Sequence, residues 1–206
     1  MPRDVAAAKT EDGSADETEQ RNENGGDERL SQRPPILPSP FVADWIARVA
    51  AESIGARRAL DLATGRGRHL VALGRAGFEP YGVDNRFEAL ESARAASAGA
   101  GIFARLWCAD LTVHPLPAAR FDLIVVSRYL QRVLFDAIRR ALTPGGVLIY
   151  ETFTTAQRAL GTGPRSPDHL LEPGELRSAF VDCEMLFYEE VSAPEALARL
   201  VARTPA

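Results

Sequence analysis

Between residues 59 and 153, short apolar runs alternate with stretches of helical periodicity, and this alternation constrains the fold more than any other feature. Strands that alternate with helices form βαβ units, in which right-handed crossovers join parallel strands. One run, Phe121–Val126, is apolar throughout, which is typical of a central strand covered on both faces. The predicted strands are Ala59–Leu62, Pro80–Asp84, Ile102–Trp107, Phe121–Val126 and Val147–Phe153.

The intervals between the strands, and the segment before the first strand, carry apolar residues at helical spacing. After residue 153 the pattern changes to a Gly- and Pro-rich stretch, 154–172, and then a short helix that opens at Pro173. Two further strand candidates, 184–190 and 198–203, are separated by so few residues that they can only pair antiparallel. We therefore expect a doubly wound, Rossmann-like α/β fold with a seven-stranded sheet, mostly parallel, that ends in an antiparallel hairpin. The predicted helices cover residues 41–54, 67–76, 87–98 and 131–142.

The charge of the chain is concentrated in its first 33 residues. This segment holds nine acids and five bases, which accounts for the whole formal net charge of −4, and it has very few large apolar residues. Such a composition buries too little apolar surface to offset the entropy cost of ordering the chain. We expect a disordered acidic tail at 1–33 and one folded domain at 34–206.

Composition also excludes several classes of function. The remaining body is electrically neutral, whereas nucleic-acid binding needs clustered positive charge. No apolar run is long enough for a membrane span, and there is no apolar signal segment at the N-terminus. Two cysteines without a Cys-x-x-Cys or His/Cys cluster predict no metal site and a reducing, cytoplasmic setting. The expected partner is a small molecule, and the chain is expected to be a monomer or homodimer.

A glycine-containing turn joins the first strand to its helix and is the strongest candidate for a ligand site. The segment Leu60–Leu70 contains Asp61, Ala63, Gly65 and Gly67. Glycines at such a turn leave space for close approach of a ligand, and the helix start presents unpaired N–H groups. A dinucleotide site would have a third glycine at position 70, where this chain has leucine. The turn therefore predicts a ligand site, and the leucine disfavours NAD as its ligand.

Two acids follow the next two strands. Asp84 ends the second strand, where a carboxylate can accept hydrogen bonds from both ribose hydroxyls; capping of the following helix is the structural alternative. Asp110 follows the third strand, where it can accept from an adenine amine or cap a turn. The neighbouring Asn85, Arg86 and Leu111 complete the predicted surroundings of the sugar and the purine.

These motifs resemble those of the class I S-adenosylmethionine (SAM)-dependent methyltransferases over about residues 41–203. The matching segments are Ala59–His69, Tyr81–Asp84, Cys108–Leu111, Phe121–Val126 and Leu142–Leu148. The resemblance implies SAM as cofactor, bound by Asp61, Ala63, Gly65, Gly67, Asp84, Asn85, Arg86, Asp110, Leu111 and Ser127. Thr64 stands where cysteine or glycine is more usual in this family.

Within the family, the chain is similar to the branch of tellurite-resistance-type methyltransferases. This similarity rests on Arg128–Arg132, Tyr150–Thr154 and Leu170–Leu176, while Ser166 departs from the asparagine that is common there. No Asn/Asp-Pro-Pro-Tyr motif follows the fourth strand, so amino-methylation of adenine or glutamine by that motif is not expected. The branch implies a small acceptor, either a thiol or a chalcogen oxyanion such as tellurite or selenite.

The candidates for the acceptor side lie after the fourth strand and in the irregular stretch. Arg128 can hold an anionic acceptor or form a salt bridge, and Tyr129 can shape the pocket or pack. His169 lies in the long loop, which is a candidate lid. The prediction is therefore a small-molecule methyltransferase with Arg128, Tyr129 and His169 at the reacting end. A non-catalytic SAM-binding module and an NAD-linked oxidoreductase are the alternatives.

Overall fold

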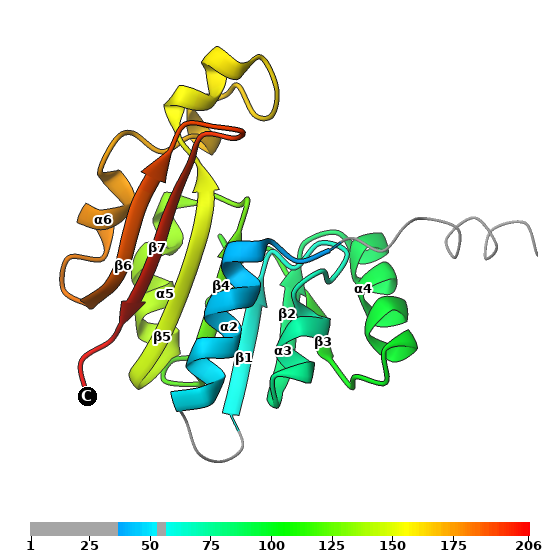
Figure 1. Ribbon diagram of the computed structural model, residues 1–206. Coiled ribbons are helices and arrows are strands. Elements are labelled where there is room, and N and C mark those ends of the chain that lie inside the picture. Colours follow the sequence, from blue (N-terminus) through cyan, green and yellow to red (C-terminus); the bar gives the residue numbers. More distant parts are fainter. Residues whose placement is uncertain (1–36, 53–56) are drawn as a thin grey trace, which may run out of the picture. The chain divides into compact units, whose positions relative to one another are not determined.

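The computed structural model describes residues 37–52 and 57–206, so the predicted acidic tail at 1–33 lies outside the described residues. The strands form one seven-stranded sheet in the order β3-β2-β1-β4-β5-β7-β6 (Figure 1). The first five strands are parallel, and β7 pairs antiparallel with both β5 and β6. This confirms the predicted fold class and the terminal hairpin. The strands are β1 (Arg57–Leu62), β2 (Phe78–Asp84), β3 (Arg105–Cys108), β4 (Phe121–Ser127), β5 (Leu142–Phe153), β6 (Glu184–Val191) and β7 (Leu197–Arg203).

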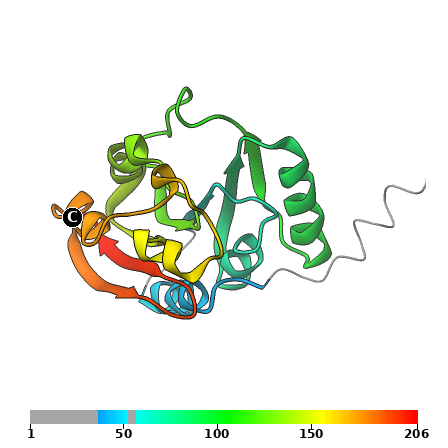
Figure 2. The ribbon, with the colours of Figure 1, turned by 90° about the horizontal axis from the view of Figure 1, so that it is seen from above.

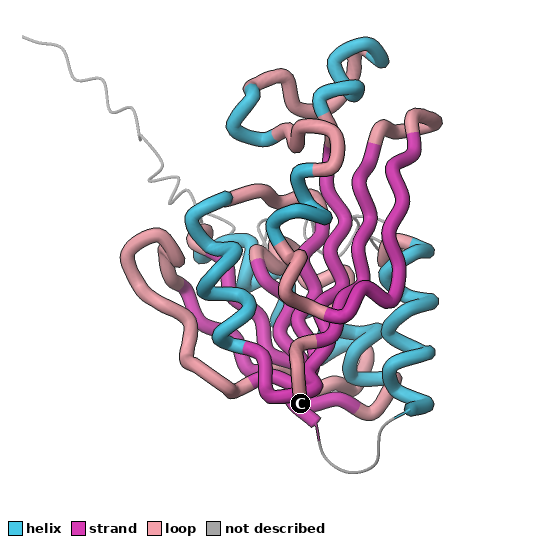
Figure 3. The backbone as a smooth tube through the Cα atoms, turned by 90° about the vertical axis from the view of Figure 1, so that its left-hand side faces the viewer, coloured by secondary structure: helices cyan, strands magenta, loops and turns pink. Residues whose placement is uncertain are grey.

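Helices cover both faces of the sheet (Figure 3). On one face, α2 (Pro40–Glu52) buries Val42, Ile46 and Val49, whose spacing of four and three residues places them on one stripe. The neighbouring α3 (Leu70–Arg75) and α4 (Phe87–Gly99) pack beside it along β2 and β3. On the other face lie α5 (Phe135–Ala141) and α6 (Glu175–Ala179).

Alternating residues of the central strands divide between two cores. In β1, Ala59 contributes to the core under α2 and α3, while Leu60 and Leu62 contribute to the core under α5 and α6. Strand β4 is buried on both faces, as its apolar sequence predicted. This rigid centre fixes the direction in which the strand ends point.

Several predicted boundaries differ from the structure. The helix predicted at 67–76 begins only at Leu70, because Gly67 has a positive φ of 78° that a helix cannot contain. The helix predicted at 131–142 is a 3-10 turn at 132–134 followed by α5, and Leu142 already pairs with Phe121 in the sheet. The strand predicted from Val147 begins at Leu142, and residues 144–146, which separate the predicted helix from the predicted strand, form a bulge inside β5 where the register shifts.

The stretch after β5 is also less irregular than predicted, since it holds 3-10 helices at Thr155–Leu160 and Pro167–His169. Seen from above the carboxyl ends of the parallel strands, this segment lies over the β5 side of the sheet (yellow to orange), and α4 lies at the opposite end (Figure 2). The sheet edge between them carries the turns that follow β1, β2, β3 and β4.

Candidate functional site

A cavity of about 210 Å³ opens at the carboxyl ends of β1 to β4. Strands β1 and β4 are neighbours in the sheet, and the chain leaves them in opposite lateral directions, so the cavity lies at the topological switch point of the fold. Ligands of open α/β sheets bind at this position. The cavity is lined by Ala63, Val83, Asp84, Asn85, Arg86, Ala109, Asp110, Leu111, Arg128 and Tyr129.

Backbone hydrogen bonds shape the turn after β1. Thr64 N–H donates to the carbonyl of Val83 at 2.9 Å, and Gly67 N–H donates to the carbonyl of Thr64 at 2.9 Å. Gly65 has a positive φ of 54°, and a Cβ added there would meet no atom within 4 Å. Gly65 therefore keeps the turn open on its outer side, as the sequence predicted for a ligand-binding turn.

Gly67 is required for a different reason than the predicted close approach of a ligand. A Cβ at this position would lie 2.8 Å from the Cβ of Ala93 and 2.9 Å from its Cα, on α4. The space beyond Gly67 is thus filled by the protein itself, and the glycine permits close packing of the turn against α4. Gly67 does not line the cavity, so any contribution to ligand binding passes through the shape of the turn.

Asp61 holds the turn from beneath and does not line the cavity. It is 1% exposed and accepts a hydrogen bond from Thr64 Oγ1 at 2.6 Å. Its second oxygen lies 3.5 Å from Nδ1 of the buried His69, whose Nε2 accepts from the N–H of Ser39 at 3.4 Å. His69 thereby links the glycine turn to the start of α2, a role that the sequence analysis missed.

Asp84 is the best-anchored acid of the cavity. Its Oδ2 accepts from the N–H of Gly65 at 2.8 Å, and its Oδ1 accepts from the N–H of Arg86 at 3.0 Å. The N-cap of α4 is Arg86, and no side chain caps that helix, so Asp84 does not act as the helix cap. The carboxylate is 7% exposed and joins the end of β2 to the glycine turn.

Asp110 also lines the cavity, after β3, and is exposed. Its Oδ1 accepts from both the N–H and the hydroxyl of Thr112, at 2.9 and 2.7 Å, and these bonds lower the pKa of the carboxyl. Asp110 therefore does cap a turn, as the structural alternative predicted, but only through one oxygen. The Asp-x-Thr spacing was the available sequence signal for this arrangement.

Tyr129 lines the cavity, and its main-chain carbonyl accepts a hydrogen bond from the buried Tyr150 hydroxyl at 3.0 Å. Partial burial raises the pKa of the Tyr129 phenol, and the negative charges of Asp110 and Asp84 raise it further. The phenol therefore stays protonated near neutral pH. The structure brings Tyr129 together with the two acids predicted to bind the nucleoside.

Two residues of the cavity wall have strained backbones. Ala63 at the end of β1 and Arg128 after β4 have φ values of 54° and 56°, which non-glycine residues rarely adopt. Such conformations cost about 1–3 kcal/mol each and concentrate at functional sites. Arg128 is held in place by its N–H, which donates to the carbonyl of Glu151 at 2.7 Å.

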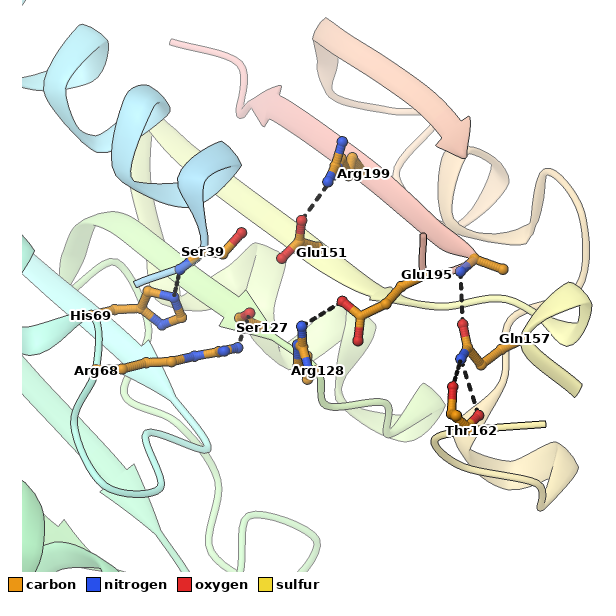
Figure 4. Close-up of polar contacts among 11 residues, drawn as sticks. Ser39, Arg68, His69, Ser127, Arg128, Glu151, Gln157, Thr162, Glu195 and Arg199 are labelled. Carbon is orange, nitrogen blue, oxygen red and sulfur yellow. Dashed lines mark hydrogen bonds and ion pairs between the residues drawn. The ribbon is translucent and has the colours of Figure 1, made fainter. Parts of the chain in front are cut away.

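Beyond Arg128, the sheet edge carries a set of charged side chains (Figure 4). Arg68 donates to Ser127 Oγ at 2.6 Å, and Arg128 pairs with Glu195 of the β6–β7 turn at 2.5 Å. Arg199 on β7 bonds Glu151 on β5 at 2.9 Å and Glu189 on β6 at 2.8 Å. Glu151 is 1% exposed, whereas the Arg199 side chain is 26% exposed, so this pair is partly buried near the end of β5. The sequence pattern did not identify Arg68 or Glu195.

His169 is exposed in the 3-10 helix at 167–169 and does not line the cavity. A catalytic role for it stays a prediction. Among residues 37–52 and 57–206, no group of three or more His, Cys, Asp or Glu side chains is placed to hold a metal ion. No helix in these ranges is both long and apolar enough to cross a bilayer.

Comparison with known protein families finds a match over part of the chain. Residues 59–146 match the model of a methyltransferase domain family. This match indicates an enzyme that transfers methyl groups, and SAM is the cofactor that such a domain implies. This finding favours methyl transfer over the NAD-linked alternative. No curated protein matches the chain.

Several solved structures share the fold of this chain. A SAM-dependent methyltransferase from Mesorhizobium loti is 24% identical, with 78% of this chain and 97% of that chain covered and a TM-score of 0.62. The [4+2]-cyclase SpnF is 16% identical, with 80% of each chain covered and a TM-score of 0.66. TehB from Haemophilus influenzae is 16% identical, with 77% of this chain and 61% of that chain covered and a TM-score of 0.62. At these identities the likeness shows the fold alone.

Proposed function

We propose that the cavity at the ends of β1 to β4 binds SAM and that the methyl group passes to a small-molecule acceptor held beside Arg128. The observation that carries this proposal is the position of Asp84. Its carboxylate is fixed by the N–H groups of Gly65 and Arg86, and Asp84 and Asp110 both line the cavity. This supports Asp84 as the acceptor for the ribose hydroxyls and Asp110 as the acceptor for the adenine amine.

The donor and acceptor set of the cavity fits this cofactor. Each oxygen of Asp84 accepts one backbone N–H and retains acceptor capacity, which suits the two hydroxyls of a ribose. The Oδ2 of Asp110 has no hydrogen-bond partner among the described residues and suits an adenine amine. Ala109, Leu111 and the ring of Tyr129 supply apolar surface for the purine.

When bound, SAM supplies a methyl group already activated on a sulfonium sulfur. The protein must therefore align the acceptor with that methyl carbon and exclude water, and such positioning contributes about 7–11 kcal/mol in ideal cases. The strained turns at Ala63 and Arg128 hold the two walls of the cavity in fixed positions. The half-buried Tyr129, with its protonated phenol, packs between the acids and can donate one hydrogen bond.

For the acceptor, we propose a thiol or a chalcogen oxyanion such as tellurite or selenite. Both react as anions, so neither needs a general base at the reacting atom, whereas an alcohol or amine would. This fits an acceptor side whose carboxylates already form ion pairs, with Glu151 bound to Arg199 and Glu195 bound to Arg128.

A second candidate is a protein of this fold that binds SAM without transferring its methyl group. The specific observation behind it is SpnF, which shares the fold and is described as a [4+2]-cyclase. Fold and cofactor site together therefore leave the reaction open to test.

The experiment that tests the proposed function has two parts. Calorimetry with SAM, S-adenosylhomocysteine (SAH) and NADH is expected to show binding of the first two only. Incubation with methyl-labelled SAM and a panel of thiols, selenite, tellurite and small carboxylic acids is then expected to label a thiol or an oxyanion. Binding of SAM without transfer to any member of the panel favours the non-catalytic candidate, and absence of SAM binding overturns the proposal.

A further inference from the structure

The side chain of Arg68 crosses from the glycine turn to the end of β4. Its Nη2 donates to Ser127 Oγ at 2.6 Å, which places the guanidinium next to Arg128 (Figure 4). Arg68 is half-buried, and no carboxylate lies within ion-pair distance of it among the described residues. A guanidinium removed from water in this way requires either a hydrogen-bonded acid or a ligand anion to offset its lost hydration.

The acids that surround Arg68 each have another partner. Its electrostatic neighbours are Arg128, Asp61, Glu151 and Glu195. Asp61 is held by Thr64 and His69, Glu151 by Arg199, and Glu195 by Arg128. Burial lowers the pKa of Arg68, with Arg128 adding to this effect, despite the opposing influence of the three acids. The neighbouring acids therefore do not fully compensate for the burial of this cation.

Arg128 is paired, but its partner can leave. Glu195 lies in the turn between β6 and β7, and the side chains of Arg128 and Glu195 are 42% and 34% exposed. An ion pair this exposed contributes only about 0–1 kcal/mol, so an external anion can displace the carboxylate at little cost. Arg128 also lines the cofactor cavity, and its guanidinium lies over the ring of Phe153. A group bound by Arg128 is thus next to the cofactor.

We propose that Arg68 and Arg128 together bind the anionic group of the methyl acceptor, and that Glu195 occupies part of this site until the acceptor arrives. This inference rests on the proposed function and narrows its substrate class to anions, with oxyanions and carboxylate-bearing thiols as members. Two guanidinium groups offer planar, bidentate hydrogen bonding, which suits an oxygen-rich anion better than a single ammonium would. The hydroxyl of Ser127 keeps Arg68 at the end of β4.

The transfer step balances for such an acceptor. With selenite, the lone pair on selenium forms the new bond to the methyl carbon while the bond from that carbon to the sulfonium sulfur breaks. The electron pair of the broken bond stays on sulfur, which gives SAH and a methylated selenium oxyanion. With a thiolate, the sulfur lone pair has the same role. Neither reaction requires an oxidant, a reductant or a proton acceptor.

A carboxylate near Arg68 has a second source, the methionine end of SAM itself. The two sources are distinguished by SAH, which contains that carboxylate, and by selenite, which is a free oxyanion. If the guanidinium groups bind the acceptor, their loss leaves SAH affinity in place and weakens selenite binding. If Arg68 binds the cofactor carboxylate, its loss weakens SAH binding instead.

The test measures SAH binding by calorimetry, and then selenite binding to the SAH-saturated protein. The variants are Arg68→Gln, Arg68→Lys, Arg128→Gln and Glu195→Gln, with Arg48→Gln as the matched control because Arg48 pairs with Asp44 on the surface of α2. We expect Arg68→Gln and Arg128→Gln each to weaken selenite binding about tenfold, since each removes a charge-assisted bond to the anion. Arg68→Lys should recover part of the loss, and thermal melting identifies any variant that does not fold.

Glu195→Gln provides a readout that a merely structural role would not change. Because this variant removes the competing internal anion, selenite binding should strengthen about two- to fivefold, within the range that an exposed ion pair supports. Weaker or unchanged selenite binding in Glu195→Gln overturns the inference, as does a loss of SAH affinity in Arg68→Gln. If the wild-type protein binds SAH and binds no selenite, the inference fails while the proposed function stands. If the wild-type protein binds no SAH, the proposed function itself fails.

Discussion

The two halves of the sheet's carboxyl edge are built in different ways. On the side of β1 to β3, main-chain groups hold the acids: Asp84 bonds the N–H groups of Gly65 and Arg86, and Asp110 bonds Thr112 two residues ahead. On the side of β4 to β7, side chains hold each other across long sequence separations, as in the pairs Arg128–Glu195 and Arg199–Glu151. A main-chain scaffold is insensitive to most substitutions, whereas one substitution removes an ion pair. The first half therefore suits a constant cofactor, and the second suits an acceptor that differs between related enzymes.

The largest effect expected from this comparison is on stability, at Gly67. Gly67→Ala places a methyl group 2.8 Å from Ala93 and imposes a positive φ on a non-glycine residue, so it should cost about 2–5 kcal/mol of folding free energy. Gly65→Ala has open space around the new methyl and should cost only the backbone strain, about 1 kcal/mol. Denaturant unfolding measures both variants. Equal losses for the two would contradict the packing role assigned to Gly67.

The next effect is on cofactor affinity, at Asp84. Asp84→Ala removes the proposed acceptor for the ribose and should weaken SAM binding by about 1–3 kcal/mol, measured by calorimetry. The matched control is Asp122→Ala, because Asp122 also accepts a backbone N–H, from Arg58 at 2.9 Å, but lies at the amino end of the sheet. The control should lose stability and keep its SAM affinity. Equal losses of SAM affinity in both variants would mean that the effect comes from reduced stability of the fold and not from a lost contact with the ribose.

A smaller effect, on stability, is expected from a substitution of Arg132, on the side of β4 to β7 where we place the methyl acceptor. Its guanidinium bonds both oxygens of Glu175 at 2.5 and 2.9 Å and the carbonyl of Leu170 at 2.9 Å, so it ties the 154–172 stretch to α6. Arg132→Gln should cost about 0.5–1 kcal/mol, since the pair is partly exposed and screened by solvent. We expect faster proteolysis of residues 154–172 and unchanged SAM affinity. A loss of SAM affinity would show that the two halves are not independent.

The pair between Arg132 and Glu175 also predicts how stability depends on pH. Hydrogen bonds from Arg132 hold the pKa of the Glu175 carboxyl below its usual value. The stability that it contributes is therefore present above the unfolded-state pKa of about 4.3 and is lost as the pH falls through the lower, folded-state pKa. Proteolysis of residues 154–172 should accelerate over this acidic range in the wild type. The Glu175→Gln variant should show less of this acceleration.

The smallest effect is expected from removal of residues 1–33. If this acidic segment is disordered, as its composition predicts, the shortened protein should keep its melting temperature and its SAM affinity. Thermal melting and calorimetry check both. A large fall in melting temperature would contradict the prediction.

Sequence patterns predicted the succession of strands and helices along the chain well, because the chemistry of neighbouring residues determines it. The apolar run at Phe121–Val126, the acid at the end of β2 and the closely spaced final strands all act through neighbours in sequence. The late start of α3 was predictable in principle, because Gly67 can adopt a positive φ, but glycine alone does not show which φ it takes.

The features of the site that the sequence did not predict depend on contacts between residues far apart in the chain. The packing of Gly67 against Ala93, the bond from Arg68 to Ser127 and the pair between Arg128 and Glu195 join positions 26 to 67 residues apart. A single sequence carries no signal for such pairs. The strained φ of Ala63 and Arg128 is likewise imposed by the surrounding structure and not by residue type.

The central claim is that a nucleoside sits between Asp84 and Asp110, with its sulfur end toward Arg128. A crystal structure of the protein grown with SAH tests this most directly. The account predicts ribose hydroxyls within hydrogen-bond distance of Asp84, the adenine beside Leu111, and the sulfur on the side of Arg128. A structure in which SAH binds elsewhere, or in which Asp84 makes no contact with the ribose, would contradict it.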